Sequence, residues 1–147
     1  LQLLLNDSYF QLSAPKSTGR EIFNLAWLAG NLLNFSDTEH VSKQDIQATL
    51  TALTAHSISS AINKLSRKGK IYLCGGGAHN QQLVSELKQN LINHHVDRTE
   101  QLSIDGDVLE AFAFAWFAYA FDNDIVGNVP AVTGANKAVV LGTEYTA

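Results

Sequence analysis

The chain has 147 residues, a formal net charge of −4 at pH 7, and 46% hydrophobic but only 16% charged residues. This composition excludes a disordered chain, because it supplies enough apolar surface for a core. Ten cationic residues against fourteen acidic ones argue against nucleic acid as a partner. The single cysteine, Cys74, excludes an internal disulfide and a thiolate-rich zinc site, so we expect a reducing, cytoplasmic compartment.

The longest nearly apolar run covers residues 108–121 and is interrupted by Glu110. It is shorter than the ~20 residues that a membrane-spanning helix needs, so no membrane partner is expected. The opening run of leucines, residues 1–5, has no initiator methionine, basic segment or cleavage site. We therefore expect no signal peptide and a sequence taken from within a longer chain.

Two pairs of residues resemble capping boxes, in which a hydroxyl and a carboxylate three residues apart close the start of a helix. The first pair, Thr18 and Glu21, predicts a helix that runs to about residue 33. The second pair, Ser42 and Asp45, predicts a long helix with a continuous apolar stripe. We expect this helix to end in a basic turn at residue 68, with Gly69 as its C-cap.

A short apolar strand is predicted at residues 70–74, followed by three glycines and then a helix with apolar residues at helical spacing. Weaker strands are expected at residues 101–104 and 138–141, and a helix from the acidic residues 105–107 to about residue 121. This alternation predicts one domain of the α/β class, with a parallel or mixed sheet covered by helices. So few strands leave open sheet edges, so we expect partner strands upstream and self-association as a homodimer.

The glycines at 75–77 form the first candidate site, because a strand leads directly into them and a helix follows. Glycines bring bare backbone N–H groups and the positive end of a helix close to a ligand, an arrangement suited to phosphate. The spacing matches neither the dinucleotide-binding nor the P-loop pattern. A tight turn without any ligand is the alternative interpretation.

Glu110 is the second candidate, since it is the one charged residue in an apolar helix that we expect to be buried. A buried carboxylate needs a partner. That partner is either a local N–H group or a cation, or else a hydroxyl-rich ligand, and both interpretations remain open.

Three other segments have weaker signals. Residues 15–21 combine two cations and two hydroxyls, which could hold an anion or simply cap a surface helix. Residues 127–135 form a polar, glycine-punctuated loop of the kind that often lines ligand sites. His94 and His95 are interpreted as a solvated turn rather than metal ligands, because no third ligand is evident. The nucleophile elbow of the hydrolases does not occur in the sequence.

Five segments in this order resemble the carboxyl-terminal part of the anhydro-N-acetylmuramic acid kinases. These segments are residues 15–21, 47–51, 74–80, 105–116 and 127–135. The resemblance extends over residues 7–141 and implies one ribonuclease-H-like lobe of the sugar kinase, actin and heat-shock ATPase superfamily. Two such lobes hold ATP between them.

Enzymes of this family open the 1,6-anhydro ring of 1,6-anhydro-N-acetylmuramic acid with water and transfer the γ-phosphoryl of ATP to O6. The product is N-acetylmuramic acid 6-phosphate, an intermediate of cell-wall recycling. The resemblance implies ATP and Mg²⁺ as cofactors and Glu110 as a sugar contact. It implies nucleotide contacts by Gly75, Gly76, Gly77, Ala78, His79 and Asn80.

The family's first phosphate-binding loop and its general-base aspartate belong to the amino-terminal part, and this sequence contains no such loop. We therefore expect no catalytic residue among the 147 and no activity from them alone. Two alternatives remain: a non-catalytic nucleotide-binding or dimerisation module, and a kinase of the same superfamily that acts on another sugar.

Overall fold

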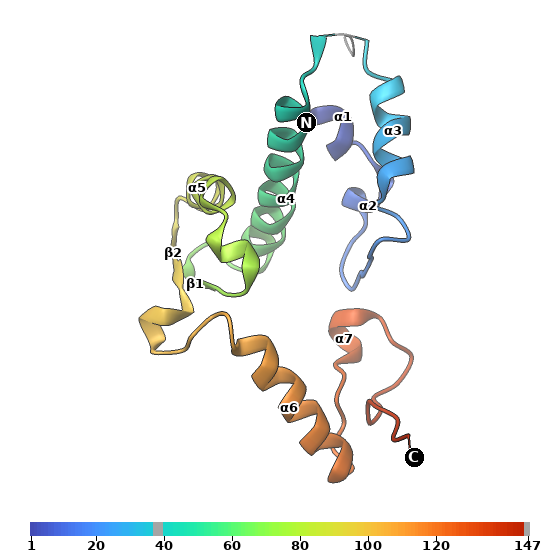
Figure 1. Cartoon of the computed structure of the whole chain (residues 1–147), viewed down its shortest axis with the longest axis vertical. Coiled ribbons are helices and arrows are strands. Elements are labelled where there is room, and N and C mark those ends of the chain that lie inside the picture. The colour runs from blue at the N-terminus through green and yellow to red at the C-terminus, as the bar shows by residue number, and fades with distance from the viewer. Residues whose placement is uncertain (37–39, 146–147) are drawn as a thin grey trace.

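The computed structural model describes residues 1–36 and 40–145. It is rich in helices and contains one small parallel sheet, which confirms the α/β class (Figure 1). The elements in chain order are α1 (Gln2–Leu5), α2 (Ser8–Gln11), α3 (Leu25–Leu33), α4 (Lys43–Leu65), β1 (Gly69–Leu73), the 3₁₀ helix η2 (Gly76–His79), α5 (Gln81–Asn90), β2 (His94–Arg98), the 3₁₀ helix η3 (Thr99–Leu102), α6 (Leu109–Asp122) and α7 (Pro130–Thr133).

The sheet consists of β1 and β2, which run parallel with Gly69 opposite His94 and Leu73 opposite Arg98. The strand predicted at residues 70–74 is confirmed to within one residue. The strand predicted at 101–104 is wrong, because this segment lies in η3 and the turn after it. The second strand is instead β2. Its sequence is mostly polar and shows no apolar alternation, and Val96 is its one buried residue.

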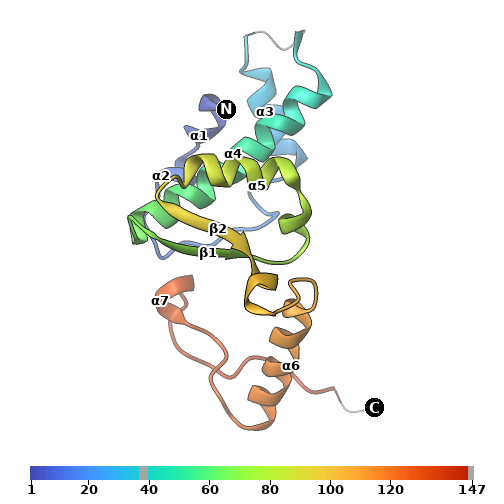
Figure 2. The ribbon, with the colours of Figure 1, turned by 90° about the vertical axis from the view of Figure 1, so that its left-hand side faces the viewer.

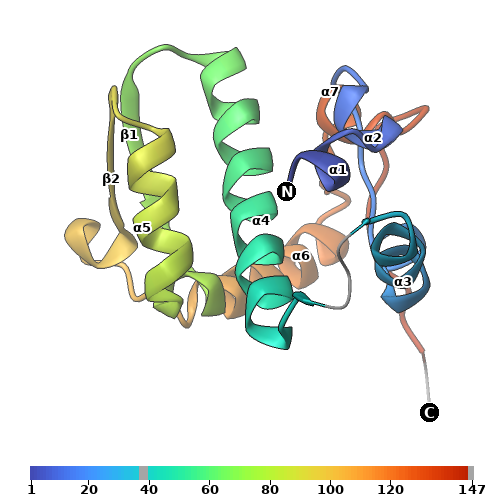
Figure 3. The same cartoon turned by 90° about the horizontal axis from the view of Figure 1, so that it is seen from above.

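The core lies between the sheet and the two longest neighbouring helices. Figure 3 shows α5 between the strands and α4. The fully and partly buried side chains of this core come from α4, β1, α5 with its C-cap, and β2: Ala55, Ile62, Ile71, Leu73, Leu83, Leu87, Leu91 and Val96. The β1–α5–β2 unit is therefore held by apolar packing against α4, and this fixes the loop after β1.

The first predicted helix begins later than expected. The carboxylate of Glu21 accepts hydrogen bonds from the Gly19 N–H at 2.6 Å and the Thr18 hydroxyl at 3.2 Å, which leaves this segment as a turn. Asn24 is the actual N-cap of α3, because its side-chain oxygen accepts from the Trp27 N–H at 3.0 Å. Side chains that bond the local backbone compete with helix formation, so the first capping-box prediction was wrong in its position.

The second capping box is confirmed. Ser42 Oγ accepts from the Asp45 N–H, and the Asp45 carboxylate accepts from the Ser42 N–H, both at 3.1 Å. The predicted end of this helix is wrong, since α4 stops at Leu65. Ser66 turns the chain by donating its hydroxyl to the Lys68 carbonyl at 2.7 Å, and Gly69 is the first residue of β1 rather than a C-cap.

Helix α6 forms as predicted, but it is not buried. Phe112 and Phe114 are 65% and 66% exposed, and Ala120 is the helix's one buried residue. Figure 2 shows the reason: α6 extends away from the sheet and from α4 and α5. Within residues 1–36 and 40–145, none of the helices combines the length and apolar character required to cross a bilayer.

The segment after α6 folds back without forming the strand predicted at residues 138–141. Gly127 N–H donates to the Val139 carbonyl at 3.0 Å, and the side chain of Asn128 bonds the backbone of Val139 and Lys137. An asparagine side chain supplies two of these three bonds, so the pairing is local and no strand ladder develops.

Candidate functional site

The glycine turn, residues 74–80, connects β1 to α5. Gly75 has a φ of +70°, a conformation that residues with a Cβ rarely adopt, so this position requires glycine. Residues 76–79 form η2, and the Asn80 side chain accepts from the Leu83 N–H at 3.1 Å. Asn80 thereby caps α5, the helix predicted after the glycine turn.

The space beside the glycines is open. A Cβ placed on Gly75 or Gly76 would meet no atom of the described residues within 4 Å, and one on Gly77 would meet Leu83 at 3.8 Å. The three glycines thus leave bare backbone next to solvent, where a Cβ would take up room available to a ligand. This geometry fits a phosphate group approaching the backbone N–H groups of Gly76 and Gly77.

A second segment packs against the glycine turn from far along the sequence. Gly75 N–H donates to the Gly106 carbonyl at 3.1 Å, and Gly106 N–H donates to the Glu100 carboxylate at 3.3 Å. A Cβ on Gly106 would lie 3.0 Å from the Thr99 hydroxyl and 3.3 Å from the Cys74 Cα. Sequence reasoning missed the need for glycine here, although a glycine between two aspartates ahead of a helix was a visible signal.

His79 and Asp107 provide a side-chain link between the same two segments. The distance between His79 Nε2 and Asp107 Oδ1 is 2.7 Å, and both side chains are more than half exposed. The structure therefore places the predicted nucleotide-binding residues next to the segment that opens α6.

Glu110 lies in the first turn of α6 and is exposed. Among the described residues its carboxylate has neither a hydrogen-bond nor an ion-pair partner. The interpretation that a local N–H group or a cation satisfies it therefore has no support within residues 1–36 and 40–145. The carboxylate is free to accept hydrogen bonds from a ligand.

A polar hollow of about 560 Å³ lies beside the glycine turn. It is lined by the amino-terminal half of α4 and the start of α5: Lys43, Gln44, Gln47, Ala48, Thr51, Asn80 and Gln82. Asn80 belongs to both the hollow and the glycine turn. Sequence reasoning singled out residues 47–51 only through the family resemblance, since amides on a helix face carry no signal by themselves.

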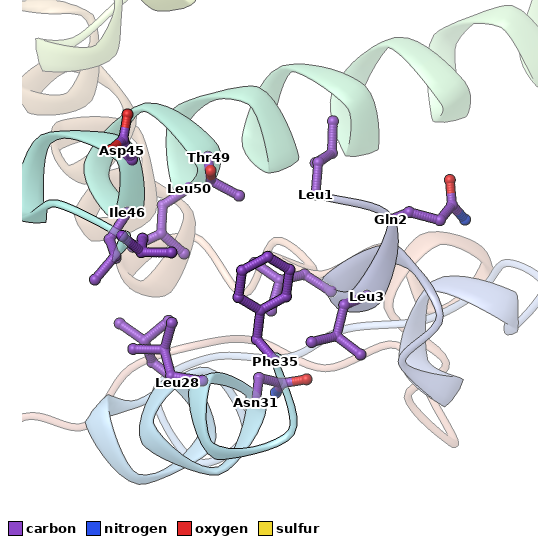
Figure 4. Close-up of a pocket in the computed structure, with 13 residues that line it drawn as sticks. Leu1, Gln2, Leu3, Leu28, Asn31, Phe35, Asp45, Ile46, Thr49 and Leu50 are labelled. Carbon is purple, nitrogen blue, oxygen red and sulfur yellow. The ribbon is translucent and has the colours of Figure 1, made fainter. Parts of the chain in front are cut away.

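An apolar groove of about 410 Å³ lies elsewhere, between α1, α3 and α4 (Figure 4). Leucines and Phe35 dominate its lining, and its one charged residue is Asp45. The hydroxyl of Ser42, helped by the Ser42 N–H, holds the pKa of the Asp45 carboxyl below its usual value. This carboxylate is committed to the helix cap, so the groove offers packing surface rather than reactive groups.

In the candidate anion site at residues 15–21, one of the two cations and one of the two hydroxyls, Lys16 and Thr18, already bond other groups of the chain. Lys16 Nζ donates to the Tyr9 carbonyl at 2.9 Å and lies 4.5 Å from the centre of the Tyr9 ring. Hydrogen bonds from the N–H groups of Glu21 itself and of Gly19 lower the pKa of the Glu21 carboxyl. The alternative interpretation, a capped surface helix, is wrong in that the Glu21 carboxylate closes a turn ahead of α3.

The two remaining candidates differ from expectation. His94 and His95 are the first residues of β2, so the predicted solvated turn is wrong. Both His94 ring nitrogens are buried and have no hydrogen-bond partner within residues 1–36 and 40–145. Among the described residues no three metal-ligating side chains gather together. The loop at residues 127–135 contains the short helix α7. Gly134 is the C-cap of this helix and lies near Pro15.

Comparison with known proteins decides the family. The family model for anhydro-N-acetylmuramic acid kinase matches residues 1–147. The chain belongs to this family. It is 47% identical to the anhydro-N-acetylmuramic acid kinase of Colwellia psychrerythraea (strain 34H / ATCC BAA-681), over 99% of this chain and 39% of that protein. It is also 47% identical to the enzyme of the same name from Shewanella frigidimarina (strain NCIMB 400), over 100% of this chain and 39% of that protein.

These identities confirm the resemblance drawn from the five segments. The chain spans about two fifths of the length of the curated relatives it matches.

Proposed function

We propose that this chain supplies the carboxyl-terminal part of an ATP-dependent kinase for 1,6-anhydro-N-acetylmuramic acid. The complete enzyme would open the anhydro ring with water and phosphorylate O6, giving N-acetylmuramic acid 6-phosphate for cell-wall recycling in the cytoplasm. The observation that carries this proposal is the packing of Gly75 against Gly106, because it joins an open glycine turn to the helix that presents Glu110. Family membership supports the choice of substrate.

The nucleotide would bind along the glycine turn. The backbone N–H groups of Gly76 and Gly77 would donate to the phosphates, while Gly75, whose N–H bonds Gly106, would contact the nucleotide by its bare Cα. Ala78, His79 and Asn80 would complete the contacts to the phosphates and the adjoining sugar. The polar hollow beside Asn80 has the amide and hydroxyl groups that suit the uncharged end of ATP. Mg²⁺ would arrive with ATP and neutralise phosphate charge, and we assign no protein ligand for it in this chain.

The acceptor sugar would lie over the start of α6, where the Glu110 carboxylate accepts hydrogen bonds from its hydroxyls. A carboxylate binds hydroxyl groups strongly because charge-assisted hydrogen bonds exceed neutral ones in strength. The base that activates water, and the first phosphate loop, would come from the amino-terminal part. This chain's role is thus positioning, which contributes much of the rate in phosphoryl transfer.

We also propose that the chain forms one ribonuclease-H-like lobe and that the protein is a homodimer. The two-stranded sheet and the exposed aromatic residues of α6 support both proposals, because each leaves surface that further strands or a second copy would cover. Sedimentation at high concentration tests the second point: a dimer supports it, and a monomer contradicts it.

The decisive experiment measures ADP release by the complete natural protein that carries this sequence, with Mg²⁺ and ATP. Three reactions are compared: 1,6-anhydro-N-acetylmuramic acid, plain N-acetylmuramic acid, and no sugar. We expect turnover with the anhydro sugar alone. Nucleotide binding without any turnover would instead favour a non-catalytic module, and turnover with another sugar would favour a different kinase of the superfamily.

A further inference from the structure

We propose that Asp107 is a positioning residue which, through His79, couples nucleotide binding at the glycine turn to sugar binding at Glu110. The inference rests on the proposed function, since it assigns ligands to both segments. It adds a role for the contact between two side chains, of which His79 is also a proposed nucleotide contact and Asp107 is assigned no ligand.

The two segments are joined at both ends of η2. At its start, Gly75 N–H donates to the Gly106 carbonyl at 3.1 Å. At its end, His79 Nε2 lies 2.7 Å from Asp107 Oδ1, although 28 positions separate these residues in the chain. A ligand that shifts η2 therefore pulls on residues 106 and 107 together.

Residues 105–107, which these two bonds connect to η2, are also held by hydrogen bonds on their own side. The Asp107 N–H donates to Asp105 Oδ1 at 2.9 Å, and the Gly106 N–H donates to Glu100 Oε1 at 3.3 Å. Because Gly106 also packs against Cys74 and Thr99, residues 105–107 can move only as a unit. Glu110 follows three residues later in the first turn of α6, so its position depends on this unit.

The exposure of the pair argues for a positioning role over a purely structural one. The His79 and Asp107 side chains are 53% and 63% exposed, so their interaction adds little to the stability of the fold. It nevertheless lies between the two elements that the proposed function gives to ATP and to the sugar. Its loss should change how one ligand affects the other more than it changes folding.

The test measures the dissociation constant of a non-hydrolysable ATP analogue, with and without 1,6-anhydro-N-acetylmuramic acid, in the complete natural protein. The ratio of the two constants is the coupling factor. We expect Asp107→Ala to reduce this factor by about threefold, within the range of a single hydrogen bond. Asp107→Asn keeps an acceptor oxygen and should retain most of the coupling. Asp122→Ala, at the last residue of α6, is the matched control and should leave the factor unchanged.

A second route uses His79→Ala, alone and combined with Asp107→Ala. If the two residues act through each other, the double variant loses no more coupling than either single variant. His79→Ala also provides the test if Asp107→Ala lowers the melting temperature, because each single variant removes the same hydrogen bond from a different side.

The outcomes separate this inference from the proposed function. Sugar-dependent turnover in the wild type with a coupling factor of one, or with a factor unchanged in both single variants, overturns the inference alone. Absence of turnover with every sugar overturns the proposed function and this inference with it.

Discussion

Gly106 lies so close to Cys74 that a Cβ on the glycine would stand 3.3 Å from the Cys74 Cα. The contact joins the end of the first strand to the segment that begins α6. The Cys74 Cα is a backbone atom, and a Cβ on Gly106 would be bonded directly to the backbone. Neither atom could therefore move away by a side-chain rotation. The alignment of the glycine turn with Glu110 therefore depends on the absence of one methyl group.

We expect Gly106→Ala to destabilise the complete protein by about 1–3 kcal/mol, as overpacking of a close contact does. The Michaelis constant for ATP should rise, because the glycine turn would be pushed away from residues 105–107. Thermal unfolding and steady-state kinetics measure the two effects. The control is Gly30→Ala in α3, where a Cβ meets nothing within 4 Å and should stabilise by about 0.5–1 kcal/mol. Equal effects of the two substitutions would contradict the packing argument.

Gly76→Val tests the open space beside the glycine turn. Since a Cβ at Gly76 meets no protein atom within 4 Å, the fold should tolerate the side chain. Nucleotide affinity should fall by about tenfold or more, equivalent to about 1.4 kcal/mol, because the side chain would occupy the room a phosphate needs. Calorimetric titration with an ATP analogue measures this, and undiminished affinity would remove residue 76 from the proposed site.

Glu110→Gln tests the sugar contact. The exposed carboxylate has no partner among the described residues, so the substitution should leave the melting temperature unchanged. The Michaelis constant for the anhydro sugar should rise by about tenfold, the cost of losing a hydrogen bond to a charged group, while that for ATP stays constant. Asp122→Asn near the other end of α6 is the control. A larger effect on ATP than on the sugar would be evidence against this assignment.

The cap of α4 predicts a specific pH dependence. Hydrogen bonds from Ser42 lower the pKa of Asp45 below its ordinary value of 3.8. A lowered pKa in the folded state means that the stabilisation is present above the ordinary pKa and is lost as the pH falls through the folded-state pKa. Ser42→Ala should therefore lower the melting temperature by a few degrees at neutral pH and by less in acid, as thermal unfolding in both buffers would show. A difference that does not change with pH would refute this.

The 147 residues alone should show no sugar-dependent release of ADP, because the proposed base and the first phosphate loop lie outside them. The measurement is ADP release with Mg²⁺, ATP and the anhydro sugar, as for the complete protein, at high protein concentration. Detectable turnover that requires the anhydro sugar would show that this chain contains the catalytic base after all.

Local patterns predicted the parts of the fold that local chemistry determines. The Ser42 and Asp45 pair located the start of α4, and the glycines after an apolar strand located the turn that leads into α5. The strand at residues 94–98 was missed, because its polar side chains hide a strand whose stability comes from pairing with β1. The packing of Gly106 on Cys74 was missed for the same reason, since contacts between distant segments leave no periodicity in the sequence.

The sequence predicted that α6 would be buried, and this was wrong because the prediction rested on the apolar composition of the helix. A helix with apolar residues on all sides is normally buried, yet the described residues leave most of it open. The two main candidate segments lie side by side, because the glycine turn bonds Gly106 and Asp107 ahead of α6, whereas ligand binding by their residues stays a prediction. The polar hollow beside Asn80 was not foreseen, because it depends on how α4 lies against α5.

The two tryptophans of the chain lie in very different surroundings, and this gives the protein two built-in optical probes. Trp27 packs edge-on against Phe23 and donates its indole N–H to Asp7 at 2.8 Å, whereas Trp116 is 47% exposed on α6. A dissolved quencher such as iodide should therefore dim Trp116 well before Trp27. Fluorescence from single-tryptophan variants can then follow the helical amino-terminal region and α6 separately, including the moment at which another surface covers α6.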